Sequence, residues 1–120
     1  MKQGSGLSKD TDRKDLFPGA VEMMVLHVLR RQRLHGYALV QTIKRSSQDL
    51  LQVEEGSLYP ALQRMLKAGL VKARWEVSAS GRRVRTYELT ARGAAHLDRE
   101  VSSFERMLEG IRRVLAPVKP

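Results

Sequence analysis

Two stretches of the chain carry side chains that could bind a polyanion such as DNA. In EEGSLYPALQRMLKAGL, residues 54–70, apolar residues recur at helical spacing. The side chains off this apolar stripe or at its margin are Ser57, Tyr59, Pro60, Gln63, Arg64 and Lys67. Arginine can hydrogen-bond guanine, glutamine adenine, and lysine can neutralise phosphate, whereas Tyr and Pro offer apolar surface to a thymine methyl group. The set therefore suits a helix in the major groove, although a solvated helix face has a similar composition.

The second stretch is SGRRVR, residues 80–85. Strand alternation places Arg83 and Arg85 on one face, with Arg82 at the turn. Gly81 allows the backbone to approach a phosphate closely. These residues could grip the DNA backbone, or they could form a charged edge that prevents aggregation of the sheet.

Two aromatic residues allow more than one interpretation. Tyr37 follows Gly36 at the start of a predicted helix, whose free N–H groups could bind a phosphate; a core position for Tyr37 is equally compatible with the sequence. Trp75 lies on a predicted strand, and we expect it to pack within the domain rather than to contact a ligand or DNA.

Composition favours a small domain with a polyanionic partner, although a solubilising surface charge or a partner of acidic membrane lipid would give a similar excess. The 120 residues fit one domain, and the formal net charge is +9. The excess is concentrated between residues 72 and 92, where six basic residues accompany two acidic ones. The chain has no cysteine, no signal-peptide pattern and no apolar run long enough for a membrane span. We therefore expect a cytoplasmic protein that does not enter the membrane.

The elements positioning these side chains follow from periodicity and from residues typical of helix ends. We expect a flexible arm at residues 1–15, helices at 18–36 and 36–51, and a very short strand at Val53. Ser57 would cap a third helix, with Pro60 in its first turn and Gly69 at its end. A β-hairpin follows, and Thr90 would cap a long helix that Pro117 stops. The expected fold is mainly α with a small β-hairpin: a winged helix-turn-helix at residues 16–90 and a long C-terminal helix at residues 91–116.

The long helix carries an unbroken heptad seam. Its apolar residues alternate in steps of three and four: Ala94, Leu97, Val101, Phe104, Leu108, Ile111 and Leu115. The seam could pack on its own domain, but more than 20 residues beyond the hairpin leave little domain to cover. We therefore expect the residues from Leu97 onward to form a dimer interface, helped by a first helix that is apolar nearly all round. A membrane-surface helix fits less well, since acidic side chains line the polar face.

An enzyme is poorly supported. The three histidines show no metal-ligand spacing with carboxylates, and nucleophile-elbow, zinc-protease and phosphate-loop motifs do not occur. We therefore expect no catalytic residue, no metal and no cofactor.

Three segments together resemble the PadR family of bacterial transcriptional regulators. They are LHGYALVQTI, VEEGSLYPALQRMLKAGLV and RRVRTYELTARG, and the resemblance covers about residues 16–115. A single C-terminal helix resembles the small PadR-like subfamily. The resemblance implies a homodimeric winged-helix repressor of a pseudo-palindromic operator in double-stranded DNA, and release by a small-molecule effector as a further expectation. A protein-interaction winged helix and a non-specific nucleic-acid binder are the other classes that remain.

Overall fold

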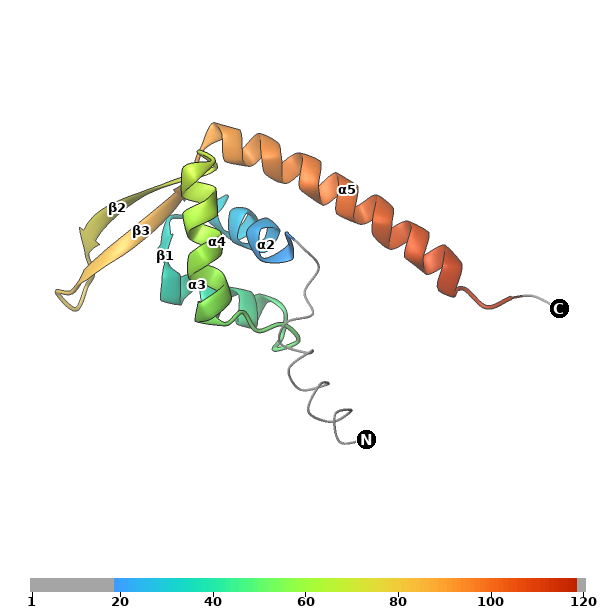
Figure 1. The fold of residues 1–120 in the computed structure, drawn as a ribbon. Coiled ribbons are helices and arrows are strands. Elements are labelled where there is room, and N and C mark those ends of the chain that lie inside the picture. The colour runs from blue at the N-terminus through green and yellow to red at the C-terminus, as the bar shows by residue number, and fades with distance from the viewer. Residues whose placement is uncertain (1–18, 119–120) are drawn as a thin grey trace.

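The computed structural model describes residues 19–118 as a helical domain with a small sheet and one long projecting helix (Figure 1). In chain order the elements are α2 (Ala20–Leu29), β1 (Leu34–His35), α3 (Gly36–Ser46), α4 (Glu55–Lys67), β2 (Val71–Val77), β3 (Arg83–Leu89) and α5 (Ala91–Leu115). The predicted fold class, a mainly helical winged helix-turn-helix with a long C-terminal helix, is confirmed. The expected arm at residues 1–15 and the expected helix start at Pro18 lie outside the described residues.

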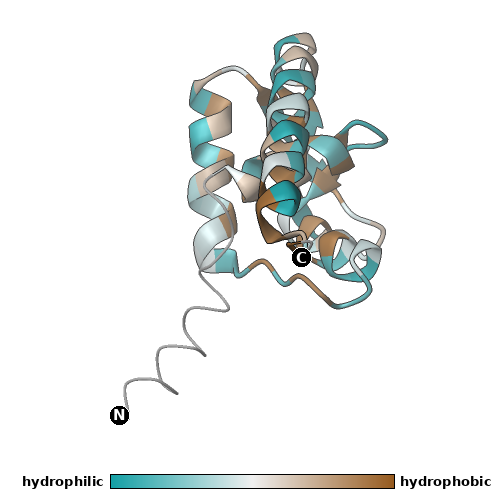
Figure 2. Cartoon of the chain, turned by 90° about the vertical axis from the view of Figure 1, so that its right-hand side faces the viewer, coloured by the Kyte–Doolittle hydropathy of each residue, from teal (hydrophilic) through white to brown (hydrophobic). Residues whose placement is uncertain are grey.

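The core lies where α2 meets α3, α4 and the start of α5. Hydrophilic and hydrophobic residues alternate along α3, α4 and α5 (Figure 2), so these helices turn one side inward, whereas α2 is apolar nearly all round. The largest fully buried side chains come from all four helices: Val25, Leu26, Leu39, Leu58, Leu62, Met65 and Leu97. Each such side chain contributes roughly 1.5–3 kcal/mol through burial, and this core fixes the angle at which α4 is presented.

The sheet is antiparallel, in the order β1-β3-β2. The predicted hairpin of β2 and β3 is present over its full length, from Val71 opposite Leu89 to Val77 opposite Arg83. The first predicted helix was too long, because α2 ends at Leu29 and residues 34–35 pair with β3 instead. A two-residue strand has no periodicity of its own, so only its pairing with Thr86 and Tyr87 defines it.

The second predicted helix was also too long, since α3 ends at Ser46. Gln48 and Asp49 adopt left-handed backbone angles, with φ of 53° and 66°, which a helix cannot continue. The Ser47 hydroxyl accepts a hydrogen bond from the Leu51 amide at 3.0 Å and closes the turn. Val53 forms no strand; it is buried in the connector just before α4.

The start of α4 differs from the prediction by three residues. Glu54 is the N-cap, so Ser57 is the third helical residue and Pro60 the sixth. Pro60 therefore lies in the second turn, where its missing N–H leaves the Gly56 carbonyl without the usual partner. Both residues are exposed, so water can satisfy that carbonyl.

The end of α4 follows the prediction. Gly69 has a φ of 75°. The amides of Gly69 and Leu70 bond back to the carbonyls of Leu66 and Met65 at 3.1 and 2.9 Å, which closes a Schellman motif.

The long helix α5 begins as predicted, because the Thr90 hydroxyl accepts from the Gly93 amide at 3.0 Å. Gly93 lies against the backbone carbonyl of Leu70, where a Cβ atom would clash. An ion pair of 2.8 Å between Arg30 and Asp98 also ties α5 to the end of α2. α5 stays against the domain as far as Leu108, and its last turns project away from it (Figure 1). None of the helices described is both long enough and apolar enough to cross a membrane.

Candidate nucleic-acid interface

The outer face of α4 carries the residues that the sequence singled out. Leu58, Ala61, Leu62 and Met65 are buried, and this inner stripe leaves the opposite side free. All six predicted residues of this segment are exposed: Ser57, Tyr59, Pro60, Gln63, Arg64 and Lys67. At 100° per residue, Pro60, Gln63 and Lys67 lie opposite the buried stripe, while Tyr59 and Arg64 lie on its two flanks. The centre of the exposed face can therefore enter a groove, while the residues on each flank contact different neighbouring elements.

On one flank, the Tyr59 side chain lies against the start of α3. A Cβ atom at Gly36 would come within 2.5 Å of the Tyr59 hydroxyl oxygen, so the glycine makes room for the ring. Burial, the Glu55 carboxylate and the neighbouring Tyr87 raise the pKa of Tyr59 above 10.0, in that order of importance. The phenol therefore stays protonated and able to donate a hydrogen bond at neutral pH.

The start of α3 adds Tyr37 to the same region. His35 caps this helix, since its Nδ1 accepts from the Ala38 amide at 3.3 Å. Tyr37 is the second helical residue and is 59% exposed, so it does not take the core position that the sequence left open. His35 was not singled out from the sequence, because a histidine cap has no distinctive pattern.

The wing presents one face rich in arginine and aromatic side chains. Strand alternation and cross-strand pairing place Arg83, Arg85 and Tyr87 with Trp75 on this face. The Arg83 guanidinium lies 4.6 Å from the centre of the Trp75 ring, and that of Arg85 lies 6.0 Å from the Tyr87 ring. Trp75 is 57% exposed, so it supports an arginine and does not pack into the core as expected.

The tip of the wing is a tight turn. Gly81 has a φ of 85°, and the Ser78 hydroxyl accepts from the Arg82 amide at 3.2 Å. The turn leads into β3, with Arg82 immediately before the strand and Arg83 and Arg85 within it. The predicted wing residues are thus contiguous and exposed.

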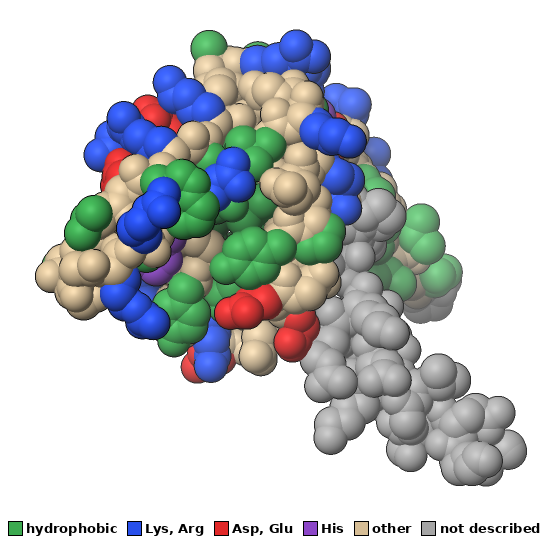
Figure 3. Space-filling view, turned by 60° about the vertical axis from the view of Figure 1, so that its left-hand side comes forward, with side chains coloured by type: hydrophobic (Ala, Val, Ile, Leu, Met, Phe, Trp, Pro, Cys, Tyr) green, Lys and Arg blue, Asp and Glu red, His purple; other side chains and the backbone are tan. Residues whose placement is uncertain are grey.

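A hollow joins the three elements. It has a volume of about 550 Å³ and is lined by His35, Gly36 and Tyr37 before and within α3, by Tyr59 of α4, and by the wing from Trp75 to Tyr87. In Figure 3, basic side chains lie beside hydrophobic ones over this part of the surface, and acidic side chains lie along its lower edge. The fold therefore brings Tyr37, Tyr59 and the wing arginines together, although they are far apart in the sequence.

The two faces of the hairpin differ in their ion pairs. On one face, Arg74 pairs with Glu76 at 3.2 Å and with Glu88 at 3.8 Å. On the other, Arg83 and Arg85 have no carboxylate within ion-pair distance among residues 19–118, and the same is true of Arg82 and Lys67. Their charges remain available to phosphates.

Arg64, on the second flank of α4, differs from these cations. Its guanidinium bonds to the Glu22 carboxylate of α2 at 2.6 and 3.1 Å. Sequence reasoning missed Glu22, because the two residues are 42 positions apart and no local pattern links them.

The predicted seam of α5 divides into covered and uncovered parts. Leu97 is completely buried within its own domain, so its side chain is not available to a partner. Val101, Phe104 and Leu108 are partly buried. Ile111 and Leu115 are 37% and 75% exposed, because α5 has passed the end of the domain.

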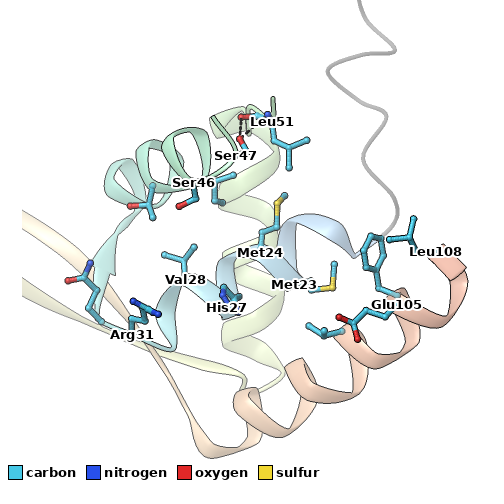
Figure 4. A pocket seen from close by; sticks show the side chains of 15 residues that line it. Met23, Met24, His27, Val28, Arg31, Ser46, Ser47, Leu51, Glu105 and Leu108 are labelled. Atoms are coloured by element: carbon cyan, nitrogen blue, oxygen red, sulfur yellow. Dashed lines mark hydrogen bonds between the residues drawn. The ribbon is translucent and has the colours of Figure 1, made fainter. Parts of the chain in front are cut away.

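A larger cavity of about 670 Å³ opens between α2, α3 and α5. Figure 4 shows side chains from these helices around it, among them Met23 and Met24 of α2 and Leu108 of α5. His27, Arg31 and Glu105 add polar groups at its wall. Within residues 19–118, no cluster of three or more His, Asp or Glu side chains could hold a metal ion.

Comparisons with known proteins agree with this fold. The model of the transcriptional regulator PadR-like family matches residues 25–99, from α2 into α5. A transcriptional regulator from Clostridium thermocellum has a similar fold, with a TM-score of 0.77 at 22% identity over 85% of this chain and 96% of that one. A PadR-like transcriptional regulator from Bacillus cereus has a TM-score of 0.73 at 24% identity, over 87% and 99% of the two chains. Uncharacterized protein X of Lysinibacillus sphaericus is 28% identical over 98 residues, 81% of this chain and 89% of its own length.

Proposed function

Since the chain belongs to the transcriptional regulator PadR-like family, we propose that it is a homodimeric repressor that binds a pseudo-palindromic operator. The family accounts for DNA-binding regulation; the dimer, the operator and repression are the proposal. The observation that carries it is the hollow in which Tyr59, on one flank of α4, meets Tyr37 and the wing residues Arg82, Arg83 and Arg85. These three arginines form no ion pair within residues 19–118.

In the proposed complex α4 enters the major groove. Pro60, Gln63 and Lys67 lie at its outermost face, so they meet base edges and the nearest phosphates. The wing arginines and Tyr37 lie to one side of α4 and contact the phosphates of the DNA backbone. These contacts do not select a sequence. The net charge of +9 adds long-range attraction to the duplex.

The dimer would form through α5. Ile111 and Leu115 continue the seam beyond the domain, and a second copy of the same helix would cover them. A two-fold axis through this interface would place the two α4 helices for successive major grooves, roughly 34–36 Å apart. Bound in this way, the dimer blocks polymerase; such a regulator acts in the cytoplasm of a bacterial cell.

The cavity between α2, α3 and α5 supports release by a small-molecule effector. Its wall is largely apolar, with a few polar groups, which suits a small aromatic or amphipathic molecule. Because α5 forms one wall, a molecule that fits only one position of α5 would favour one spacing of the two α4 helices. Occupation of the cavity would then weaken operator binding.

A salt titration of binding tests the proposal. A duplex selected by the protein and a scrambled duplex of the same length are compared at increasing salt. We expect the selected duplex to bind more tightly throughout. Both affinities should fall with salt, because the release of counterions from the DNA gains less free energy at higher salt. Equal affinities at every salt concentration would indicate a non-specific nucleic-acid binder, and no binding at all would indicate a protein-interaction module.

A further inference from the structure

Arg64 is the one predicted DNA-contacting cation whose guanidinium is already held by a carboxylate within residues 19–118. Its Nε and Nη2 atoms both donate to Oε2 of Glu22, at 3.1 and 2.6 Å. The arginine side chain remains 62% exposed, whereas that of Glu22 is only 22% exposed. The Glu22 carboxylate is therefore the more buried partner, and the Arg64 guanidinium is the one that remains open to solvent.

Glu22 occupies one edge of the Arg64 guanidinium, and this determines which N–H donors remain free to bind another acceptor. A guanidinium has five N–H donors, and the pair on Nε and one side of Nη2 faces Glu22. The end of the group keeps a second pair of parallel donors, one on Nη1 and one on Nη2. Two parallel donors are what the O6 and N7 acceptors of guanine require in the major groove.

Glu22 also has a fixed place in the fold. It lies in the first turn of α2, where the helix dipole stabilises a negative charge. Val25 and Leu26, which follow it on α2, are fully buried and anchor that helix in the core. The carboxylate therefore restrains an otherwise flexible arginine side chain before DNA binds, which lowers the entropy cost of binding.

We propose that Glu22 is a positioning residue for sequence recognition: it holds Arg64 so that the free end of the guanidinium reads a guanine beside α4. This inference rests on the proposed function, and it assigns to Arg64 base reading and to the wing arginines phosphate contact.

The test compares base preferences of variants by selection from a random DNA pool, followed by affinity measurements on single-base changes. Glu22→Ala, Arg64→Ala and the double variant are measured with the wild type. Glu55→Ala is the matched control, because it removes a carboxylate from the exposed first turn of α4 without touching Arg64. Circular dichroism and thermal unfolding establish that each variant is folded, and Glu22→Gln replaces Glu22→Ala if that variant is not.

We expect the wild type to prefer guanine at one position of each half-site by about 5- to 150-fold. Arg64→Ala and Glu22→Ala should both weaken this preference at the same base pair, and the double variant should lose no more than Arg64→Ala alone. Glu55→Ala should raise affinity for all sequences alike and leave the preferences unchanged.

Three results would overturn the inference. Unchanged preferences in Arg64→Ala would show that Arg64 does not read a base. Unchanged preferences in a folded Glu22 variant, beside altered ones in Arg64→Ala, would remove the role of Glu22. Tighter binding of the Glu22 variant to every sequence, with preferences intact, would make Glu22 a restraint on binding. A wild type without any preference would instead contradict the proposed function.

Discussion

Tyr59 and Arg64 occupy opposite flanks of α4, and each is held by an element distant in sequence. Tyr59 rests against Gly36, and Arg64 is bound by Glu22. Periodicity was sufficient to predict that both side chains are exposed, because the apolar stripe of α4 is regular. It could not predict their partners, since those contacts depend on how α2 and α3 pack against α4.

The environment of Tyr59 predicts a pH effect. Its pKa is raised above 10.0, so the neutral phenol is favoured in the folded protein. The stability gained in this way is present below the unfolded pKa of 10.0 and is lost as the pH rises through the higher folded pKa. Alkaline titration of the phenolate absorbance should show a component above that value in the wild type and not in Tyr59→Phe. Persistence of this component in the variant would assign it to another residue.

The exposed arginines of the wing predict a different effect from that of Arg64. Arg83 lies over Trp75 with no carboxylate partner among the described residues, so it is free to neutralise a phosphate. Arg83→Ala should weaken binding of all duplexes alike and reduce the slope of log affinity against log salt by about 1. Arg74→Ala, on the ion-paired face of the hairpin, is the control and should change neither quantity much. A change of base preference in Arg83→Ala would give the wing a role in reading sequence.

Among the elements, the start of α4 illustrates how local signals compete. Ser57 is a good capping residue, but Val53 and Leu58 are both buried in the core on either side of Glu54. These are the positions of a hydrophobic staple, which fixes the helix start at Glu54. The hairpin and the cap of α5 were predictable because turn residues and Thr90 act locally. Strand β1 and the early end of α2 were not, because a pairing with β3 defines them.

Two glycines of α5 should respond oppositely to the same substitution. Gly93→Ala would force a Cβ atom against the Leu70 carbonyl, part of the backbone, so we expect a loss of about 1–3 kcal/mol in the free energy of unfolding. Gly110→Ala meets open space and should gain about 0.5–1 kcal/mol. Urea unfolding at one protein concentration measures both. Equal effects of the two substitutions would contradict the close approach of α5 to the loop after α4.

At the scale of the whole molecule, the heptad seam indicated a dimer helix but not where the domain ends. The structure places Leu97 inside the domain and leaves Leu115 uncovered. The sequence could not separate these roles, since both residues satisfy the same 3–4 spacing. The cavity beside α5 was likewise unpredictable, because three helices must be placed before it exists.

The proposed dimer predicts that Leu115→Asp lowers the molar mass in solution to that of one chain. Leu115 is 75% exposed, so the charge should not disturb the fold of the domain. Ser102→Asp, an exposed position of α5 off the seam, should leave the mass unchanged. Light scattering measures both variants, with circular dichroism to verify the fold. A wild-type mass in folded Leu115→Asp would count against the seam as the interface.

Selection of bound sequences from a random DNA pool tests the central claim, sequence-specific binding by a two-fold dimer, most directly. We predict an enriched inverted repeat whose half-site centres are one helical turn, roughly 10–10.5 base pairs, or a multiple of it apart. A pool that remains random, or one enriched in a single unrepeated motif, would contradict the account.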